Sequence, residues 1–243
     1  MAEFERNYAR AAGRVGEIQA VDEGLRGYML RVYNYMAIGL GLTGVAALGT
    51  FTLALNNQAF AELIYVSPLR WVIILAPLAM VFLLSFRINR MSVAAAQTTF
   101  WVYAAMVGLS LSSIFLVYTT TSITRVFFIT AATYGALSLY GYTTKKDLSG
   151  WGSFLFMGLI GIIIAMLVNL FLVSSALQFA ISVIGVLVFA GLTAYDTQQI
   201  KEMYYVGDDG TVAGRKAVMG ALRLYLDFIN LFLMLLQLFG NRN

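Results

Sequence analysis

Long stretches without a charged residue constrain this chain more than any other feature. No Asp, Glu, Lys or Arg lies between Arg90 and Arg125, and none lies from Trp151 to Tyr195. About 20 apolar residues are enough for an α-helix to cross the hydrocarbon core of a bilayer. The chain is 60% hydrophobic and 12% charged, whereas a soluble domain is about 45–50% apolar and about 25% charged. The pattern predicts an all-α integral membrane protein rather than a β-barrel, whose alternating short segments are absent from the sequence.

Charged borders and turn residues divide the apolar sequence into seven expected spans. These spans cover residues 33–55, 71–86, 96–117, 126–142, 151–172, 177–195 and 221–239. We place the break in the longest charge-free block at Ser174–Ser175, and Pro77 is expected to kink the second span. Residues 21–31 favour a separate interfacial helix, and residues 197–220 favour a loop rich in charge and glycine. The sequence leaves open whether the last segment crosses the membrane or dips in and returns.

The distribution of Lys and Arg favours a cytoplasmic N-terminus. With that orientation, every Lys and Arg before the last segment except Arg70 and Arg125 falls on the cytoplasmic side. Residues 1–24 contain five acids and no long apolar core, so we expect a cytoplasmic tail rather than a signal peptide. Residues 25–243 then form the seven-helix transmembrane domain.

The residue types that are missing exclude several kinds of chemistry. The chain contains no His and no Cys, so the usual metal ligand and thiolate chemistry are unavailable. Its basic residues are scattered through short loops, which argues against a nucleic-acid partner. No Gly-rich phosphate loop or metal-binding helix motif occurs, and Asp208 and Asp209 beside Gly210 favour a turn over an EF-hand. We therefore expect no resident cofactor.

Two carboxylates, Asp196 and Asp227, lie in otherwise apolar segments. An acid at membrane depth costs roughly 2.5–3.5 kcal/mol on insertion scales and is by default a functional-site hypothesis. If both acids face the interior at one depth they can approach each other, and two close carboxylates cannot both ionise cheaply. Such a pair can hold a shared proton or attract Ca²⁺ weakly and transiently, since a full Ca²⁺ site needs about six to eight oxygens. The alternative for Asp196 is an ordinary solvated acid at the end of its span.

Asp227 belongs to a polar stripe on the last segment. At about 100° per residue, Arg223, Asn230 and Gln237 share its helix face. Polar side chains within a bilayer turn towards the protein interior or a water-filled cavity. We therefore expect this helix to be central, with the other six around it. The alternative is a local ion pair between Arg223 and Asp227, which are four residues apart, near the membrane surface.

Two acids within a membrane also occur in intramembrane aspartyl proteases, so that class was weighed. Asp196 is followed by Thr-Gln, and neither acid lies in an Asp-Thr-Gly or Gly-x-Gly-Asp setting. A titratable pair alone does not define a reaction. We therefore expect that the protein is not an enzyme.

Three sequence motifs resemble those of the Bax-inhibitor family. They are LYLDFINLF at residues 224–232 with Phe239-Gly240 after it, AGLTAYDT at residues 190–197, and GLSLSSIFLVY at residues 108–118 continued by LSLYGYTT at residues 137–144. The resemblance covers the chain from the third span to the C-terminus. It implies a seven-helix fold with a central last helix, and for this bacterial-type member a location in the inner membrane.

The same resemblance implies a pH-sensitive passive Ca²⁺ leak, with Asp196 and Asp227 on the two motif positions of the proton sensor. It also implies that an arginine of the second helix latches the sixth-helix aspartate in the closed form. Arg87 and Arg90 are the candidates, and the sequence does not choose between them. Some family members are better described as regulators of membrane proteases or of cell death. A non-transporting regulator that contacts a membrane protease, and a proton-coupled Ca²⁺ exchanger, therefore remain alternatives.

Overall fold

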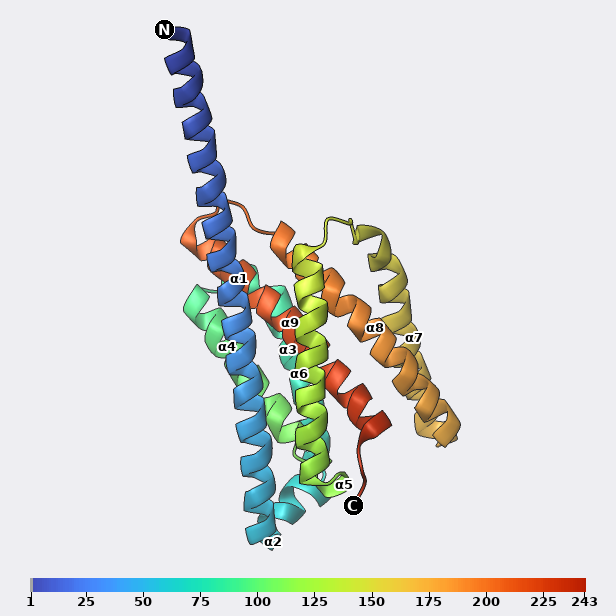
Figure 1. The fold of residues 1–243 in the computed structure, drawn as a ribbon. Coiled ribbons are helices and arrows are strands. Elements are labelled where there is room, and N and C mark those ends of the chain that lie inside the picture. The colour runs from blue at the N-terminus through green and yellow to red at the C-terminus, as the bar shows by residue number, and fades with distance from the viewer. Residues whose placement is uncertain (1) are drawn as a thin grey trace.

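The computed structural model describes the backbone of residues 2–243 and the side chains of residues 22–243. Within this part, every secondary-structure element of the chain is a helix (Figure 1). The long helices are α1 (Ala2–Asn56), α3 (Leu69–Arg87), α4 (Val93–Leu111), α6 (Thr120–Thr143), α7 (Ser149–Leu172), α8 (Ser175–Glu202) and α9 (Gly210–Phe239). The short elements are α2 (Gln58–Ala61), the π-helix η1 (Glu62–Val66), the 3₁₀-helix η2 (Ile88–Arg90) and α5 (Ile114–Val117). Over the described residues, seven helices are long and apolar enough to cross a membrane, which confirms the predicted fold class.

Two predicted boundaries were wrong because charged residues do not end a helix. Residues 21–31 are not a separate interfacial helix but part of α1, which runs without a break to Asn56. Most of residues 197–220 is helical, since α8 continues to Glu202 and α9 begins at Gly210. Polar turns of a helix that leave the bilayer are stable in water, so the end of the apolar run is not the end of the helix. The predicted tail over residues 1–24 falls mostly on side chains outside the described part.

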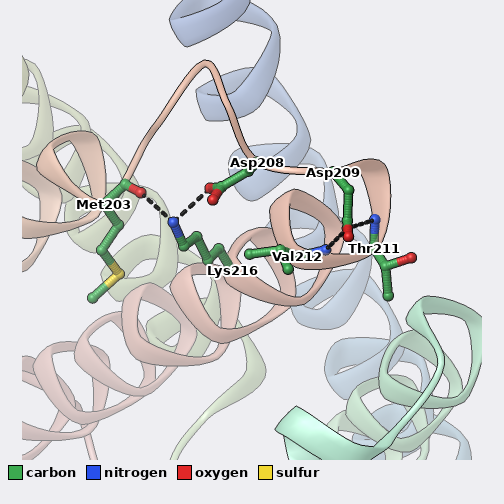
Figure 2. A network of polar contacts seen from close by, with 6 residues as sticks. All are labelled: Met203, Asp208, Asp209, Thr211, Val212 and Lys216. Carbon is green, nitrogen blue, oxygen red and sulfur yellow. Dashed lines mark hydrogen bonds and ion pairs between the residues drawn. The ribbon is translucent and has the colours of Figure 1, made fainter.

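Local capping explains where α8 begins and where α9 begins. The predicted break at Ser174–Ser175 is confirmed: Val173 adopts a left-handed conformation with φ of 48°, and the Ser174 hydroxyl accepts a hydrogen bond from the Leu177 N–H. At the start of α9, Asp209 Oδ1 accepts hydrogen bonds from the N–H groups of Thr211 and Val212 at 2.8 and 2.7 Å (Figure 2). Side-chain acceptors of this kind satisfy the free N–H groups of a first helical turn.

Lys216 connects the end of α8 to the start of α9 (Figure 2). Its Nζ donates to the Met203 carbonyl at 3.0 Å and forms an ion pair with Asp208 at 2.5 Å. Met203 is the C-cap of α8, and Asp208 immediately precedes the N-cap of α9. Asp208 and Asp209 thus form the turn that was predicted for them, and the turn sets how α9 enters the bundle.

Helix α9 is the most enclosed of the seven spans. In the most apolar 18-residue stretch of α9, 72% of the residues are buried, compared with 11% in the corresponding stretches of α3 and α7. It packs against α1, α4, α6 and α8, while α3 packs mainly on α4, and α7 mainly on α8. Figure 1 shows α9 running obliquely behind α1 and α6. Four helices, rather than the six that were expected, therefore form the main surroundings of α9.

Candidate functional site

The side chains of Asp196 on α8 and Asp227 on α9 lie within hydrogen-bonding contact of each other. Asp227 is 5% exposed, whereas Asp196 is partly buried. Asp227 Oδ2 is buried and has no hydrogen-bond donor among the described residues. The structure therefore brings together the two acids that the sequence singled out, and it leaves one carboxylate oxygen available inside the bundle.

Helices α6 and α8 pack closely near Asp196. A Cβ built on Gly141 of α6 would lie 2.2 Å from the Ala194 carbonyl oxygen of α8, so only glycine allows the two backbones to be this close. Ala194 is two residues before Asp196, and Thr193 and Thr197 on the same helix are fully buried. Asp196 had been expected at the end of its span. Because α8 continues to Glu202, Asp196 lies within the helix instead.

A chain of hydroxyl groups extends from α1 to α8 beside the aspartate pair. Ser138 of α6 shares hydrogen bonds with Tyr33 of α1 at 2.6 Å and with Thr197 of α8 at 2.9 Å. The Thr197 hydroxyl also donates to the Thr193 carbonyl at 2.7 Å. Since Thr197 follows Asp196 directly, this network ties three helices together at the level of the pair.

Tyr134 of α6 contacts the backbone of α9 near the pair. Its hydroxyl donates to the Leu224 carbonyl of α9 at 3.1 Å, and it lies close enough to both Asp196 and Asp227 to interact with them electrostatically. We did not assign a role to Tyr134, Ser138 or Thr197 from the sequence. The detectable signal was hydroxyl residues at helical spacing within apolar spans, which form such interhelical hydrogen bonds in membranes.

The other three residues of the polar stripe of α9 make separate contacts in the structure. Arg223 is exposed and acts electrostatically on both carboxylates, but among the described side chains it forms no direct ion pair with Asp227. Asn230 donates to the Leu226 carbonyl of its own helix at 2.8 Å. Gln237, nearer the C-terminal end, accepts hydrogen bonds from Ser182 at 2.8 Å and Gln178 at 3.3 Å.

Among the described side chains, neither candidate latch arginine forms an ion pair with Asp196. Arg87 ends α3 and Arg90 ends η2, and both side chains are exposed. The cation that acts on Asp196 is instead Arg223. The η2 turn is held by Arg215 of α9, which donates to the carbonyls of Asn89 at 2.9 Å and Met91 at 2.6 Å. The latch by Arg87 or Arg90 stays a prediction.

The aspartate pair is suited to transient rather than permanent metal binding. Among the described residues, no group of three or more His, Cys, Asp or Glu side chains is placed to hold a metal ion. Two carboxylates supply at most four oxygens, and Ca²⁺ takes about six to eight. A Ca²⁺ ion at this position would therefore keep part of its water shell.

Comparison with known proteins gives consistent matches along the chain. The family model described as "Inhibitor of apoptosis-promoting Bax1" matches residues 25–243. A protein of Rickettsia prowazekii is 49% identical over 236 residues, covering 97% of this chain and 98% of that protein. The inner membrane protein YbhL of Escherichia coli is 50% identical over 222 residues, covering 90% and 93%. A protein of Caulobacter vibrioides is 45% identical over 246 residues, covering 99% and 98%.

Proposed function

Because the chain belongs to the Bax inhibitor family, we propose that it is a bacterial inner-membrane protein that forms a passive, pH-sensitive leak for Ca²⁺. The similarity to a protein named as an inner membrane protein supports the location. The positive residues near the spans support a cytoplasmic N-terminus. In this orientation the turn between α8 and α9 faces the cytoplasm.

One observation carries the proposal: Asp196 and Asp227 meet in the interior of the bundle, on the central helix and one of its neighbours. A bilayer protein keeps acids at membrane depth at a cost, and such acids commonly mark ion and proton routes. Purely structural packing of α8 on α9 would be served better by apolar side chains, since buried polar pairs are often neutral or unfavourable for stability.

Protonation of the pair is the proposed gate. With one proton shared, the two carboxylates attract each other through a hydrogen bond and hold α8 against α9. When the proton leaves, two like charges in a poorly solvated site repel each other and attract a cation. Shifting a two-state gate almost completely takes about 5.5 kcal/mol, and a change of one unit in a single pKa supplies about 1.4 kcal/mol. The gate must therefore be finely balanced or couple more than one proton.

The nearby hydrogen-bond network supports a role for α6 in the same gate. Tyr134 donates to the α9 backbone and Ser138 shares a hydrogen bond with α8, so both helices that carry an acid are tied to α6. A movement of α8 away from α9 changes the contacts of Ser138. This arrangement gives protonation at the pair a direct mechanical connection to α1 through Tyr33.

A flux assay in liposomes tests the leak. The purified protein is reconstituted in vesicles that enclose a Ca²⁺ indicator, and Ca²⁺ entry is followed down its gradient at equal pH on both sides. We expect entry faster than in protein-free vesicles and no uphill accumulation when a pH gradient is imposed. Uphill accumulation would establish a proton-coupled exchanger instead, and an absence of flux would favour the non-transporting regulator.

A further inference from the structure

A groove runs between α1 and α6 on the outside of the bundle. Both helices pack against α9, but they make no extensive contact with each other in the described part of the chain. The space between them holds a cavity of about 600 Å³. Its walls are mostly apolar and include Met29, Leu30 and Leu40 of α1 and Leu139 of α6. A second cavity of about 580 Å³ shares Ala37 and Leu40 with the first and continues the groove towards the other ends of the helices.

The first of the two cavities is about as long as one leaflet of a bilayer is thick. It begins at Arg26 and ends near Leu40. At about 1.5 Å of rise per residue, this part of α1 covers about 21 Å. One leaflet with its headgroups accounts for about half of the 40–45 Å thickness of a bilayer. The groove is thus long enough to reach from the headgroup region of a leaflet to near the midplane.

The headgroup end of the groove is basic. Arg26 lines it directly. Tyr142, also in its wall, lies beneath Lys201, whose Nζ is 5.2 Å from the ring centroid and donates to the Tyr142 carbonyl at 2.9 Å. Lys145 and Lys146 are exposed immediately after the end of α6, and the exposed Asp147 follows them, so this loop keeps a net positive charge. The acids Asp22 and Glu23 lie on α1 one turn closer to the N-terminus than Arg26.

We propose that the groove between α1 and α6 is a binding site for one anionic phospholipid, with its phosphate at Arg26 and an acyl chain between the two helices. The apolar walls exclude a soluble polar ligand, and the basic mouth selects an anionic over a zwitterionic headgroup. Near a membrane surface, each Lys or Arg favours an anionic lipid by about fivefold. Tyr33 and Ser138 form part of the groove wall and of the hydroxyl chain beside the aspartate pair, so the lipid would contact that network.

Native mass spectrometry of protein released from vesicles of equal phosphatidylglycerol and phosphatidylcholine tests the site. We expect one retained lipid per chain, enriched in phosphatidylglycerol. Arg26→Gln should lower this enrichment about fivefold, whereas Arg31→Gln, on another face of α1, should leave it unchanged. Circular dichroism of each variant checks that the helices are retained.

A steric pair of variants tests the acyl-chain position. Gly135 lines the groove, and a Cβ built there meets nothing within 4 Å, so Gly135→Leu fills the groove without disturbing the bundle. It should remove the retained lipid of either headgroup. Gly161 on α7 is equally open but lies away from the groove, so Gly161→Leu is the matched control. Lipid retention that is unchanged in Gly135→Leu, or a dimer of this chain that Gly135→Leu abolishes, would overturn the proposal. Either result is independent of whether the protein conducts Ca²⁺.

Discussion

Asp227 of α9 is 5% exposed and contacts Asp196 of α8, which is itself only partly buried. The two acids therefore differ in burial although they form one pair. In the proposed gate, the less buried Asp196 exchanges protons with solvent, and Asp227 is the member whose charge is most costly. This asymmetry leads to distinct expectations for the two positions.

Replacement of Asp227 by an apolar residue should stabilise the fold. Asp227 Oδ2 is buried without a donor in the described part, and an unsatisfied buried polar atom costs about 1–3 kcal/mol. We expect Asp227→Leu to raise the midpoint of thermal unfolding in detergent micelles, and Asp196→Leu to raise it less because Asp196 is less buried. A clearly lower midpoint for Asp227→Leu would show that the buried Oδ2 is not a net cost to the fold.

Arg223 should tune the pH response, whereas Arg87 and Arg90 should not. Arg223 is the cation that acts on both carboxylates, and a nearby cation favours their ionised forms. Arg223→Gln should therefore move the midpoint of pH-dependent Ca²⁺ flux to higher pH. Arg87→Gln and Arg90→Gln are the matched controls. A shift in either control that exceeds the shift in Arg223→Gln would establish the second-helix latch.

The contact between α6 and α8 should tolerate no side chain at Gly141. Alanine there places its Cβ 2.2 Å from the Ala194 carbonyl oxygen, and such overpacking typically costs about 1–3 kcal/mol. Gly135 is on the same helix, but its added Cβ meets nothing within 4 Å, so Gly135→Ala should be neutral or stabilising by up to about 1 kcal/mol. Thermal unfolding of the two variants compares them directly, and equal midpoints would contradict the proposed close approach.

The turn before α9 should depend more on its cap than on its ion pair. Asp209 caps two N–H groups (Figure 2), and loss of an N-cap costs about 1 kcal/mol. The Lys216–Asp208 pair is partly exposed, with side-chain exposures of 32% and 13%, and such pairs contribute about 0–1 kcal/mol. We expect Asp209→Ala to lower the unfolding midpoint more than Asp208→Ala, while Asp209→Asn retains the cap. The opposite order would mean that Lys216 is the main connection.

The sequence predicted the spans well because long apolar runs directly report bilayer crossing. It predicted helix ends poorly around residues 197–220, where charge was interpreted as loop. In the structure, Asp209 caps α9 and Lys216 ties its first turns to α8, so charged residues extend the helices beyond the apolar runs. The break at Ser174 was predictable because a serine N-cap stands in the middle of an apolar run.

The site was only partly predictable. Helical phase placed Asp227 on an inward face, but no local pattern shows that Asp196 contacts it, since that contact depends on how α8 packs against α9. No sequence pattern marks Ser138 and Thr197 as site residues, because their role depends on a hydrogen bond between two different helices. The assignment of Arg87 or Arg90 came from resemblance alone and stays a prediction, while the cation that acts electrostatically on Asp196 in the described structure is Arg223.

The pH dependence of Ca²⁺ flux in liposomes tests the central claim most directly. Flux is measured from about pH 6 to about pH 8 for the native protein, Asp196→Asn, Asp227→Asn and the double variant. Asp147→Asn is the control, because the Ser149 N–H keeps the pKa of the exposed Asp147 below its ordinary range and that carboxylate stays ionised throughout. If the two acids titrate as one unit, each single variant should flatten the profile as much as the double variant does. A pH profile in all three variants that is identical to that of the native protein would contradict the account.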